Sequence, residues 1–432
     1  MLSDAALAVR LTLKKTRLIG EGAWMAFGQA IAAIGLLAGV RVLTEFVPPN
    51  VFGAISLSVG VSTFGMSIFC KPFLHAALRF YPDASQKGRI PALKKIVNGF
   101  LFRTTGMLIL ALAAAGFIFR QRMDPLLVIS LIGLLIVDVT RIREMNFLNA
   151  ARRQRPFALW QASDAWARPL AALAVIFAFG VSAGKVLAGY FAGSLLVLVL
   201  FYKSLNRDAQ AVNPGAEDGH MASEIRRFAM PLVPLAVISW ITSISDRYLI
   251  GGMAGLQQVG IYAAVYGLVS QPFLMTQLVI EQTVRPVYFE AVARGEIRRE
   301  RKAFLSLLLA TGLACLLGVI LITLLRGEVA GLLLAKKYRS GAGLIPWIAL
   351  GYAFLAMSYV FEKICYAYKR TRDVLFIEAA GAAVCLCIEI PAIYYYGIYG
   401  AALSVPVYFG IQLVISIIMA SRVMRQHKRA WA

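Results

Sequence analysis

The sequence predicts an all-α integral membrane protein, with about 12 transmembrane helices in two six-helix, pseudo-symmetric bundles around a central cavity. Of its 432 residues, 59% are hydrophobic and only 15% are charged, and the mean hydropathy is +0.72. Soluble domains contain about 45–50% apolar and about 25% charged residues. The apolar residues gather in runs of about 20, the length that crosses a bilayer as a helix. These runs leave no stretch for a soluble catalytic domain or a nucleic-acid-binding module.

Twelve apolar runs follow one another along the chain. Their approximate bounds are 20–40, 53–76, 97–119, 125–147, 158–179, 183–202, 229–249, 259–281, 303–325, 343–364, 374–396 and 398–421. The first run follows a basic segment, as the apolar part of a signal peptide does. It is about 20 residues long and many more runs follow it, so we expect it to be retained as the first transmembrane helix.

The basic residues lie mainly in alternate loops. The formal net charge is +22, and 32 of the 44 lysines and arginines fall in segments on the N-terminal side of the membrane. Such loops face the cytoplasm, so both termini are predicted to be cytoplasmic and the charge requires no nucleic-acid partner. The inner basic loops would contact anionic membrane lipids. Nine basic residues fall in outer loops: Arg41, Arg120, Arg122, Lys185, Arg247, Arg326, Lys336, Lys337 and Arg339.

The chain divides into two halves at its most polar internal segment. We expect an N-terminal six-helix bundle over 1–202, a cytoplasmic linker over 203–228 and a C-terminal six-helix bundle over 229–432. Six spans is an even number, so both halves enter the membrane from the same side. This arrangement is a parallel repeat, which in transporters places a cavity between the two bundles.

Two landmark arginines recur at the same spacing in the two halves. In each half, two arginines are 38 residues apart and a glycine lies between them. The landmarks are Arg41, Gly53 and Arg79 in the first half, and Arg247, Gly260 and Arg285 in the second. The agreement of spacing, loop sidedness and linker position favours a genuine repeat.

Ionisable residues within the apolar runs are the main functional candidates, because each costs about 2.5–3.5 kcal/mol at the centre of a membrane helix. Most fall in the cytoplasmic half of their helices; Asp246 and Glu389 do not. Three pairs have a spacing that places both charges on one helix face: Asp138–Arg141, Asp164–Arg168 and Glu281–Arg285. Such pairs either only neutralise each other or form a polar site. The neighbouring tryptophans favour a site at Asp164–Arg168.

Basic groups can bind a diphosphate while aromatic rings stack on sugars. The candidate substrate-binding residues are Lys71, Arg168, Arg285, Lys363, Trp160 and Gln29. The candidate coupling or gating residues are Asp138, Asp164, Glu281 and Glu378. A buried carboxylate in the second group could carry a coupling ion, H⁺ or Na⁺, whereas Gln29 could equally hydrogen-bond a neighbouring helix. The cysteines and histidines are dispersed, so we expect no metal site and no other cofactor.

Four blocks of sequence resemble the polysaccharide-transporter (oligosaccharide flippase) family of the multidrug/oligosaccharidyl-lipid/polysaccharide exporter superfamily. They are Gly28-Gln29 through Arg41-Val-Leu-Thr to Pro48-Pro-Asn-Val-Phe-Gly53, Ser245-Asp-Arg-Tyr-Leu-Ile-Gly251 with Val259-Gly-Ile-Tyr-Ala-Ala-Val-Tyr266, Glu328–Tyr338, and Tyr359–Arg370. The resemblance implies a bacterial cytoplasmic (inner) membrane protein that moves a polyprenyl-diphosphate-linked oligosaccharide to the outer leaflet by alternating access. It implies a role in O-antigen, exopolysaccharide or capsule assembly, beside a polysaccharide polymerase and a chain-length regulator.

Two other functions compete with this reading. A multidrug-and-toxin-extrusion cation antiporter would have the same fold and number of spans, but its cavity should be acidic with few basic groups. An integral-membrane polymerase or ligase would place catalytic acids in a large outer loop. The longest outer loop, 326–341, contains Glu328 as its only carboxylate, so we do not expect an enzyme. The related lipid II flippases usually have fourteen spans, which argues against a peptidoglycan role.

Overall fold

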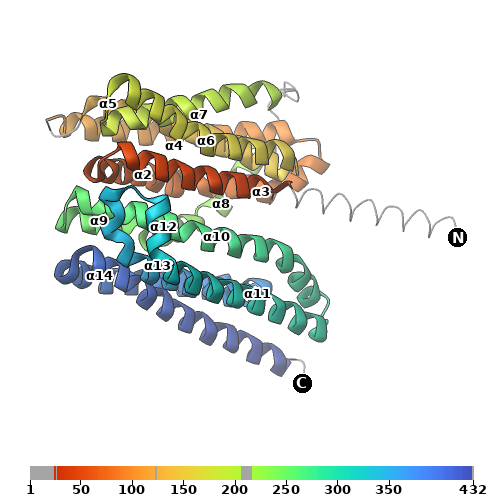
Figure 1. Ribbon diagram of the computed structural model, residues 1–432. Coiled ribbons are helices and arrows are strands. Elements are labelled where there is room, and N and C mark those ends of the chain that lie inside the picture. The colour runs from red at the N-terminus through yellow and green to blue at the C-terminus, as the bar shows by residue number, and fades with distance from the viewer. Residues whose placement is uncertain (1–23, 26, 122–123, 206–216, 431–432) are drawn as a thin grey trace. The chain divides into compact units, whose positions relative to one another are not determined.

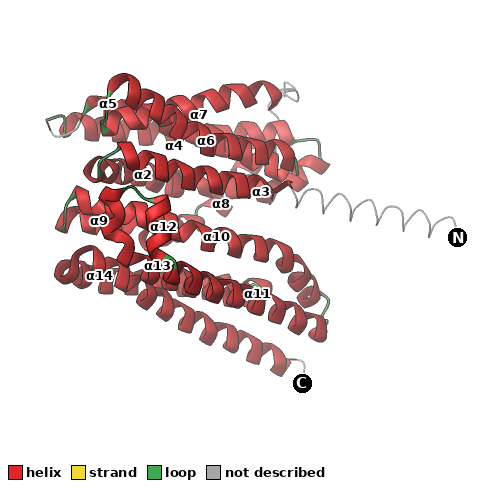
Figure 2. Cartoon of the chain, in the orientation of Figure 1, coloured by secondary structure: helices red, strands yellow, loops and turns green. Residues whose placement is uncertain are grey.

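The computed structural model describes residues 24–25, 27–121, 124–205 and 217–430, and among them it contains helices and connecting turns but no strand (Figure 2). An N-terminal helix covers Phe27–Phe46. The elements that follow are α2 (Pro49–Phe69), α3 (Lys71–Gln86), α4 (Ile90–Ile118), α5 (Pro125–Ala150), α6 (Gln154–Phe179), α7 (Ala183–Leu205), α8 (Glu217–Ala229), α9 (Leu232–Met253), α10 (Leu256–Ala293), α11 (Ile297–Leu324), α12 (Arg326–Leu333), the 3₁₀ helix η2 (Lys336–Leu344), α13 (Ile345–Ala367) and α14 (Thr371–Ala430) (Figure 1). The predicted all-α class is confirmed.

Eleven helical segments in the described ranges are long and apolar enough to cross a membrane. The last of them, in α14, holds two of the predicted spans. A continuous helix of its 60 residues would be about 90 Å long, three times the hydrocarbon thickness. Gly397 interrupts it with φ 59° and ψ −137°, a conformation that glycine adopts without steric penalty. The chain is a multi-pass membrane protein, and each of the twelve predicted runs overlaps a helix.

The chain forms two compact units. Unit 1 comprises Met1–Gly39 and Gly65–Val233, and unit 2 comprises Val40–Phe64 and Pro234–Ala432. The end of the N-terminal helix and most of α2 therefore pack with the C-terminal part of the chain. Part of the expected linker is also ordered as helix α8, which packs against α3 and α4 in unit 1.

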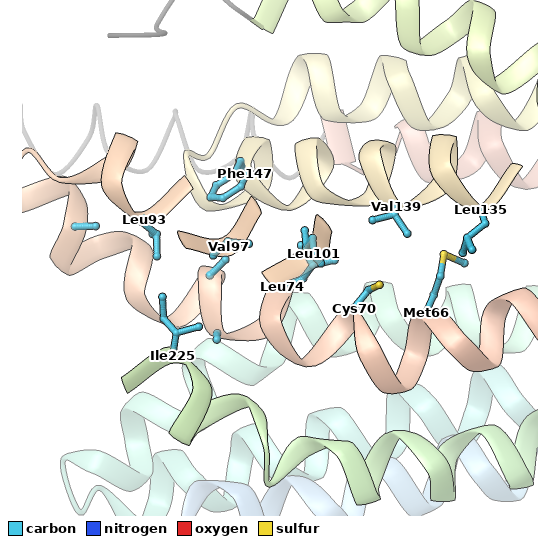
Figure 3. Close-up of a cluster of buried hydrophobic side chains, with 13 residues drawn as sticks. Met66, Cys70, Leu74, Leu93, Val97, Leu101, Leu135, Val139, Phe147 and Ile225 are labelled. Atoms are coloured by element: carbon cyan, nitrogen blue, oxygen red, sulfur yellow. The ribbon is translucent and has the colours of Figure 1, made fainter. Parts of the chain in front are cut away.

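Unit 1 has a buried apolar cluster where α3, α4, α5 and α8 meet the end of α2 (Figure 3). The labelled side chains are Met66, Cys70, Leu74, Leu93, Val97, Leu101, Leu135, Val139, Phe147 and Ile225. Burial of Ile225 explains why a segment expected as a polar linker folds: α8 is amphipathic and has one apolar face to cover. Helices α5, α6 and α7 pack against one another in the remainder of this unit.

In unit 2, two glycines allow the backbones of α2 and α10 to touch. A Cβ atom added to Gly53 would overlap the carbonyl oxygen of Leu256, and one added to Gly260 would overlap that of Pro49. Small residues at such contacts are typical of membrane helices, which associate through close packing. The two repeat landmarks Gly53 and Gly260 therefore face the same helix contact.

We expect Gly260→Ala to destabilise the protein by about 1–3 kcal/mol, because the added methyl group must separate the two helices. Gly267→Ala is the matched control on α10, since a Cβ there meets no atom within 4 Å. It should be neutral or slightly stabilising, because alanine favours helix more than glycine does. Thermal unfolding in detergent measures both changes. Equal melting temperatures for the two variants would contradict the proposed contact.

Candidate functional site

Four charged side chains form a closed cluster in unit 1. On α5, the Arg141 guanidinium donates to Asp138 Oδ1 from Nε at 3.2 Å and from Nη2 at 3.0 Å. On α6, Arg168 Nε lies 2.9 Å from Asp164 Oδ2. Two ion pairs cross between the helices: Arg168 to Asp138, and Arg141 Nη1 to Asp164 Oδ2 at 3.4 Å. Each arginine therefore contacts both aspartates.

This cluster joins a third helix through a hydrogen bond. Ser194 on α7 donates to Asp164 Oδ1 at 2.8 Å, and both aspartates are buried. Two acids balance two bases, so the cluster has no formal net charge. A phosphate could bind Arg168 only by displacing a carboxylate from it. The geometry therefore ties α5, α6 and α7 together in the state that the structure represents.

The other candidates of unit 1 lie apart from that cluster. Trp160 is fully buried and stacks on Phe201, with 5.4 Å between ring centroids. Gln29 accepts a hydrogen bond from Gln161 Nε2 at 3.1 Å and so links the N-terminal helix to α6. Lys71, the first residue of α3, is half-buried and has neither an ion pair nor a hydrogen bond within the described residues. Lys71 is the one charged side chain of these three, and no acid among the described residues pairs with it.

A second cluster, in unit 2, centres on Glu281 of α10. Its Oε1 lies 2.8 Å from Arg285 Nη1 and 3.0 Å from Lys363 Nζ on α13, and its Oε2 accepts from Gln277 Nε2 at 2.7 Å. The two bases differ in access. The Arg285 side chain is 45% exposed, whereas that of Lys363 is 13% exposed. One carboxylate thus holds two basic groups, one of them open to its surroundings.

Two further carboxylates accompany this cluster. Glu362, beside Lys363 in the chain, is buried and accepts a hydrogen bond from Ser358 Oγ at 3.1 Å. Glu378 on α14 attracts Lys363 and repels Glu362. Three carboxylates therefore surround two bases, so the charge of the cluster depends on how many of these acids carry a proton. If one of these acids loses its basic partner, it can bind a proton or another cation in its place.

A third polar group, also in unit 2, contains Asp246 of α9 and Glu389 of α14, neither of which was among the predicted site residues. They are 3% and 1% exposed. Tyr262 donates its hydroxyl to Asp246 Oδ2 at 2.8 Å, and Ser245 Oγ lies 3.3 Å from Glu389 Oε2. The two carboxylates repel each other, and in the described chain neither forms an ion pair. The neighbouring Arg247 attracts Asp246 electrostatically.

Two carboxylates buried near each other in an apolar interior need compensation, which a proton, a bound cation or the neighbouring Arg247 can supply. The sequence did carry a signal for this pair. The predicted topology places Asp246 and Glu389 outside the cytoplasmic half of their helices, whereas the predicted site residues lie on its cytoplasmic side. In the described ranges, no group of three or more His, Cys, Asp or Glu residues could hold a metal ion.

The fold resembles that of solved transporters. No family model and no curated protein matches the sequence. An inward-facing multidrug resistance MATE family transporter of the MOP superfamily superposes with a TM-score of 0.68 at 12% identity, covering 95% of both chains. The lipid II flippase MurJ, in an inward closed conformation, gives 0.66 at 15% identity over 91% of this chain and 86% of that one. A eukaryotic MATE transporter gives 0.56 at 14% identity over 96% and 99%. The chain therefore has the fold of this superfamily.

Proposed function

We propose that the protein is a flippase that carries a polyprenyl-diphosphate-linked oligosaccharide from the cytoplasmic to the outer leaflet of a bacterial inner membrane, by alternating access, for the assembly of a cell-surface polysaccharide. The observation that carries this proposal is the sharing of Glu281 by Arg285 and Lys363. Two bases on one carboxylate can receive a diphosphate, because arginine binds phosphate oxygens in pairs and lysine adds a point charge. The lipid II flippase among the solved structures supports a lipid-linked substrate.

In this proposal, the substrate competes with Glu281 for its two bases. Arg285 is the first contact, because its guanidinium is the more exposed of the two. When the diphosphate takes Lys363, Glu281 and Glu378 lose a compensating charge and each becomes a site for a coupling proton. In unit 1, Lys71 stays a separate candidate for contact with a phosphate group. Release of the diphosphate would restore the ion pairs of Glu281.

Asp138 and Asp164 have a different place in the proposal. Both are held by arginines and Ser194, so they contribute to coupling only if their cluster opens during the transport cycle. Trp160 would meet a sugar ring only in a state that exposes it. We therefore assign binding of the diphosphate to Arg285 and Lys363, with Arg285 as the first contact.

The buried pair Asp246 and Glu389 is a second candidate site for the coupling ion, besides Glu281 and Glu378. We expect Asp246→Asn to keep the fold of the protein, because the amide oxygen can accept from the backbone N–H of Arg247 while the amide nitrogen donates to the hydroxyl oxygen of Tyr262. Transport should lose its dependence on an imposed proton or sodium gradient. Uptake in proteoliposomes with and without each gradient measures this. An unchanged gradient dependence would exclude Asp246 from coupling.

A cation antiporter is the second candidate, and the same carboxylate pair is the observation that favours it. Two buried acids that form no ion pair among the described residues could hold an organic cation, and MATE transporters share the fold. The two candidates differ in the sign of the substrate. A flippase substrate should need Arg285 and Lys363, whereas an organic cation should need Asp246 and Glu389 and be repelled by the bases.

Purified protein in liposomes can distinguish the two. A polyprenyl-diphosphate carrying a fluorescent disaccharide is added to one leaflet, and its arrival in the other is followed with an impermeant quencher. The proposal expects protein-dependent movement of this lipid and no accumulation of ethidium against a gradient. Ethidium transport without lipid movement would establish the antiporter instead.

A further inference from the structure

Basic residues of the predicted outer loops gather around one hollow in unit 2. The hollow has a volume of about 450 Å³ and is lined by Arg41, Glu45, Ala335, Lys336, Lys337 and Arg339. The N-terminal helix supplies the first two residues, and the segment that joins α12 to α13 supplies the others. Four of the nine basic residues predicted to lie outside thus surround a single space.

Buried contacts fix the frame of this hollow. The fully buried Tyr338 donates its hydroxyl to the carbonyl oxygen of Val47 at 2.8 Å, and the amide of Ala335 donates to Thr44 Oγ1 at 3.3 Å. These bonds hold the start of η2 against the end of the N-terminal helix. Because Tyr338 points inward, the side chains on either side of it in the chain are left at the surface.

The charges around the hollow are unbalanced. Arg41 pairs with Glu45 at 2.5 Å, which is the single carboxylate in the lining. Arg339 donates from Nη2 to the carbonyl oxygen of Gly331 at 2.8 Å, so it is positioned but keeps its charge. Lys336 and Lys337 are exposed and make no ion pair or hydrogen bond among the described residues. Four basic groups against one acid leave the space strongly positive.

This concentration runs against the general charge bias of membrane proteins, which depletes lysine and arginine from outer loops. The hollow lies at the opposite end of α13 from the Glu281 cluster: Ile345 and Lys363 are separated by about 27 Å along the helix axis. If Glu281 lies on the cytoplasmic side, as the proposed orientation requires, the hollow lies on the outer side. The cluster of basic residues around the hollow is therefore not explained by membrane topology and calls for a functional explanation.

We propose that this hollow binds a phosphate or diphosphate group at the outer face of the membrane. Its volume falls in the range of ligand sites, about 300–1,000 Å³. Arg41 and Arg339 can offer paired N–H donors to phosphate oxygens, and the two lysines add mobile charges. The group would come either from the head of a lipid in the outer leaflet or from free phosphate. The outer placement rests on the proposed function, but binding of phosphate at this hollow does not.

Binding of inorganic diphosphate to the purified full-length protein tests the proposal. Titration calorimetry is performed in the Lys363→Gln background, so that the Glu281 cluster contributes little to the signal. Adding Lys336→Gln and Lys337→Gln should weaken binding at least tenfold with an unchanged melting temperature, because neither side chain has a partner to lose. Arg120→Gln with Arg326→Gln is the matched control: it removes the same charge from outer loops but not from the hollow, and should alter affinity less than twofold.

A competition experiment in nanodiscs identifies where the bound phosphate group comes from. Phosphatidic acid in a phosphatidylcholine nanodisc should compete with diphosphate more strongly than oleate of equal charge if a lipid head group occupies the hollow. Equal effects of the two lipids would identify free phosphate as the ligand. The proposal is overturned if the protein with the hollow intact binds no diphosphate, or if the Lys336/Lys337 variant binds it within twofold. Neither of these results would bear on flipping, which is measured separately.

Discussion

Lys363→Gln should lower the rate of lipid-linked oligosaccharide transport by about 100-fold per folded molecule. Removing one member of a buried charge pair costs about 2–5 kcal/mol of binding, and about 1.4 kcal/mol corresponds to tenfold. The loss of stability is limited because Glu281 keeps Arg285 at 2.8 Å and Gln277 at 2.7 Å, although Glu362 and Glu378 lose a neighbouring base. The quencher assay in proteoliposomes measures the rate, and the thermal midpoint of the same preparation measures folding.

Two controls make this result specific to the Glu281 cluster. Lys302→Gln makes the same chemical change at an exposed position of α11 and should leave transport within twofold of the unmodified protein. Lys363→Arg keeps the charge and should retain most of the activity. Transport that is equally fast in Lys363→Gln and Lys302→Gln would exclude Lys363 from the diphosphate site.

Arg168→Gln destabilises the protein by about 3 kcal/mol, the typical effect of removing one partner of a buried ion pair. The change leaves Asp138 and Asp164 with Arg141 as their remaining base. A lower thermal midpoint and a lower yield of monodisperse protein measure the effect.

Adding Asp138→Asn to Arg168→Gln restores the charge balance and should recover most of the lost stability. Recovery of stability would show that Arg168 acts with its two aspartates to hold α5 and α6 together. A stable Arg168→Gln variant that has lost transport would instead assign Arg168 to the substrate, as its place among the sequence candidates suggested.

Contacts within one helix could be predicted from the sequence, because helical spacing determines which residues share a face. Asp138–Arg141, Asp164–Arg168 and Glu281–Arg285 all form the expected ion pairs. Contacts between helices could not, because they depend on how each helix is rotated about its axis. Lys363 was selected as a cation, but its bond to Glu281 joins α13 to α10, and no spacing in the sequence indicates it.

The same distinction applies to the fold. The apolar runs located the spans, because hydrophobic length is a local property of the sequence. The sequence did not show that Val40–Phe64 packs with the C-terminal unit, or that part of the polar segment 203–228 forms α8. Both features depend on which apolar helix faces pack against each other in the folded protein. Gly53 and Gly260 were noticed as repeat landmarks, and their close backbone contact gives a physical reason for glycine at both positions.

The most direct test of the proposed function is the sidedness of lipid-linked oligosaccharides in cells that lack the protein. Flipping predicts that a polyprenyl-diphosphate oligosaccharide accumulates on the cytoplasmic leaflet, and that the intact gene, but not its Lys363→Gln form, relieves the accumulation. Mass spectrometry of the accumulated lipid would then identify the sugar. Normal amounts of this lipid on the outer leaflet in cells without the protein would contradict the proposal and direct attention to cation efflux.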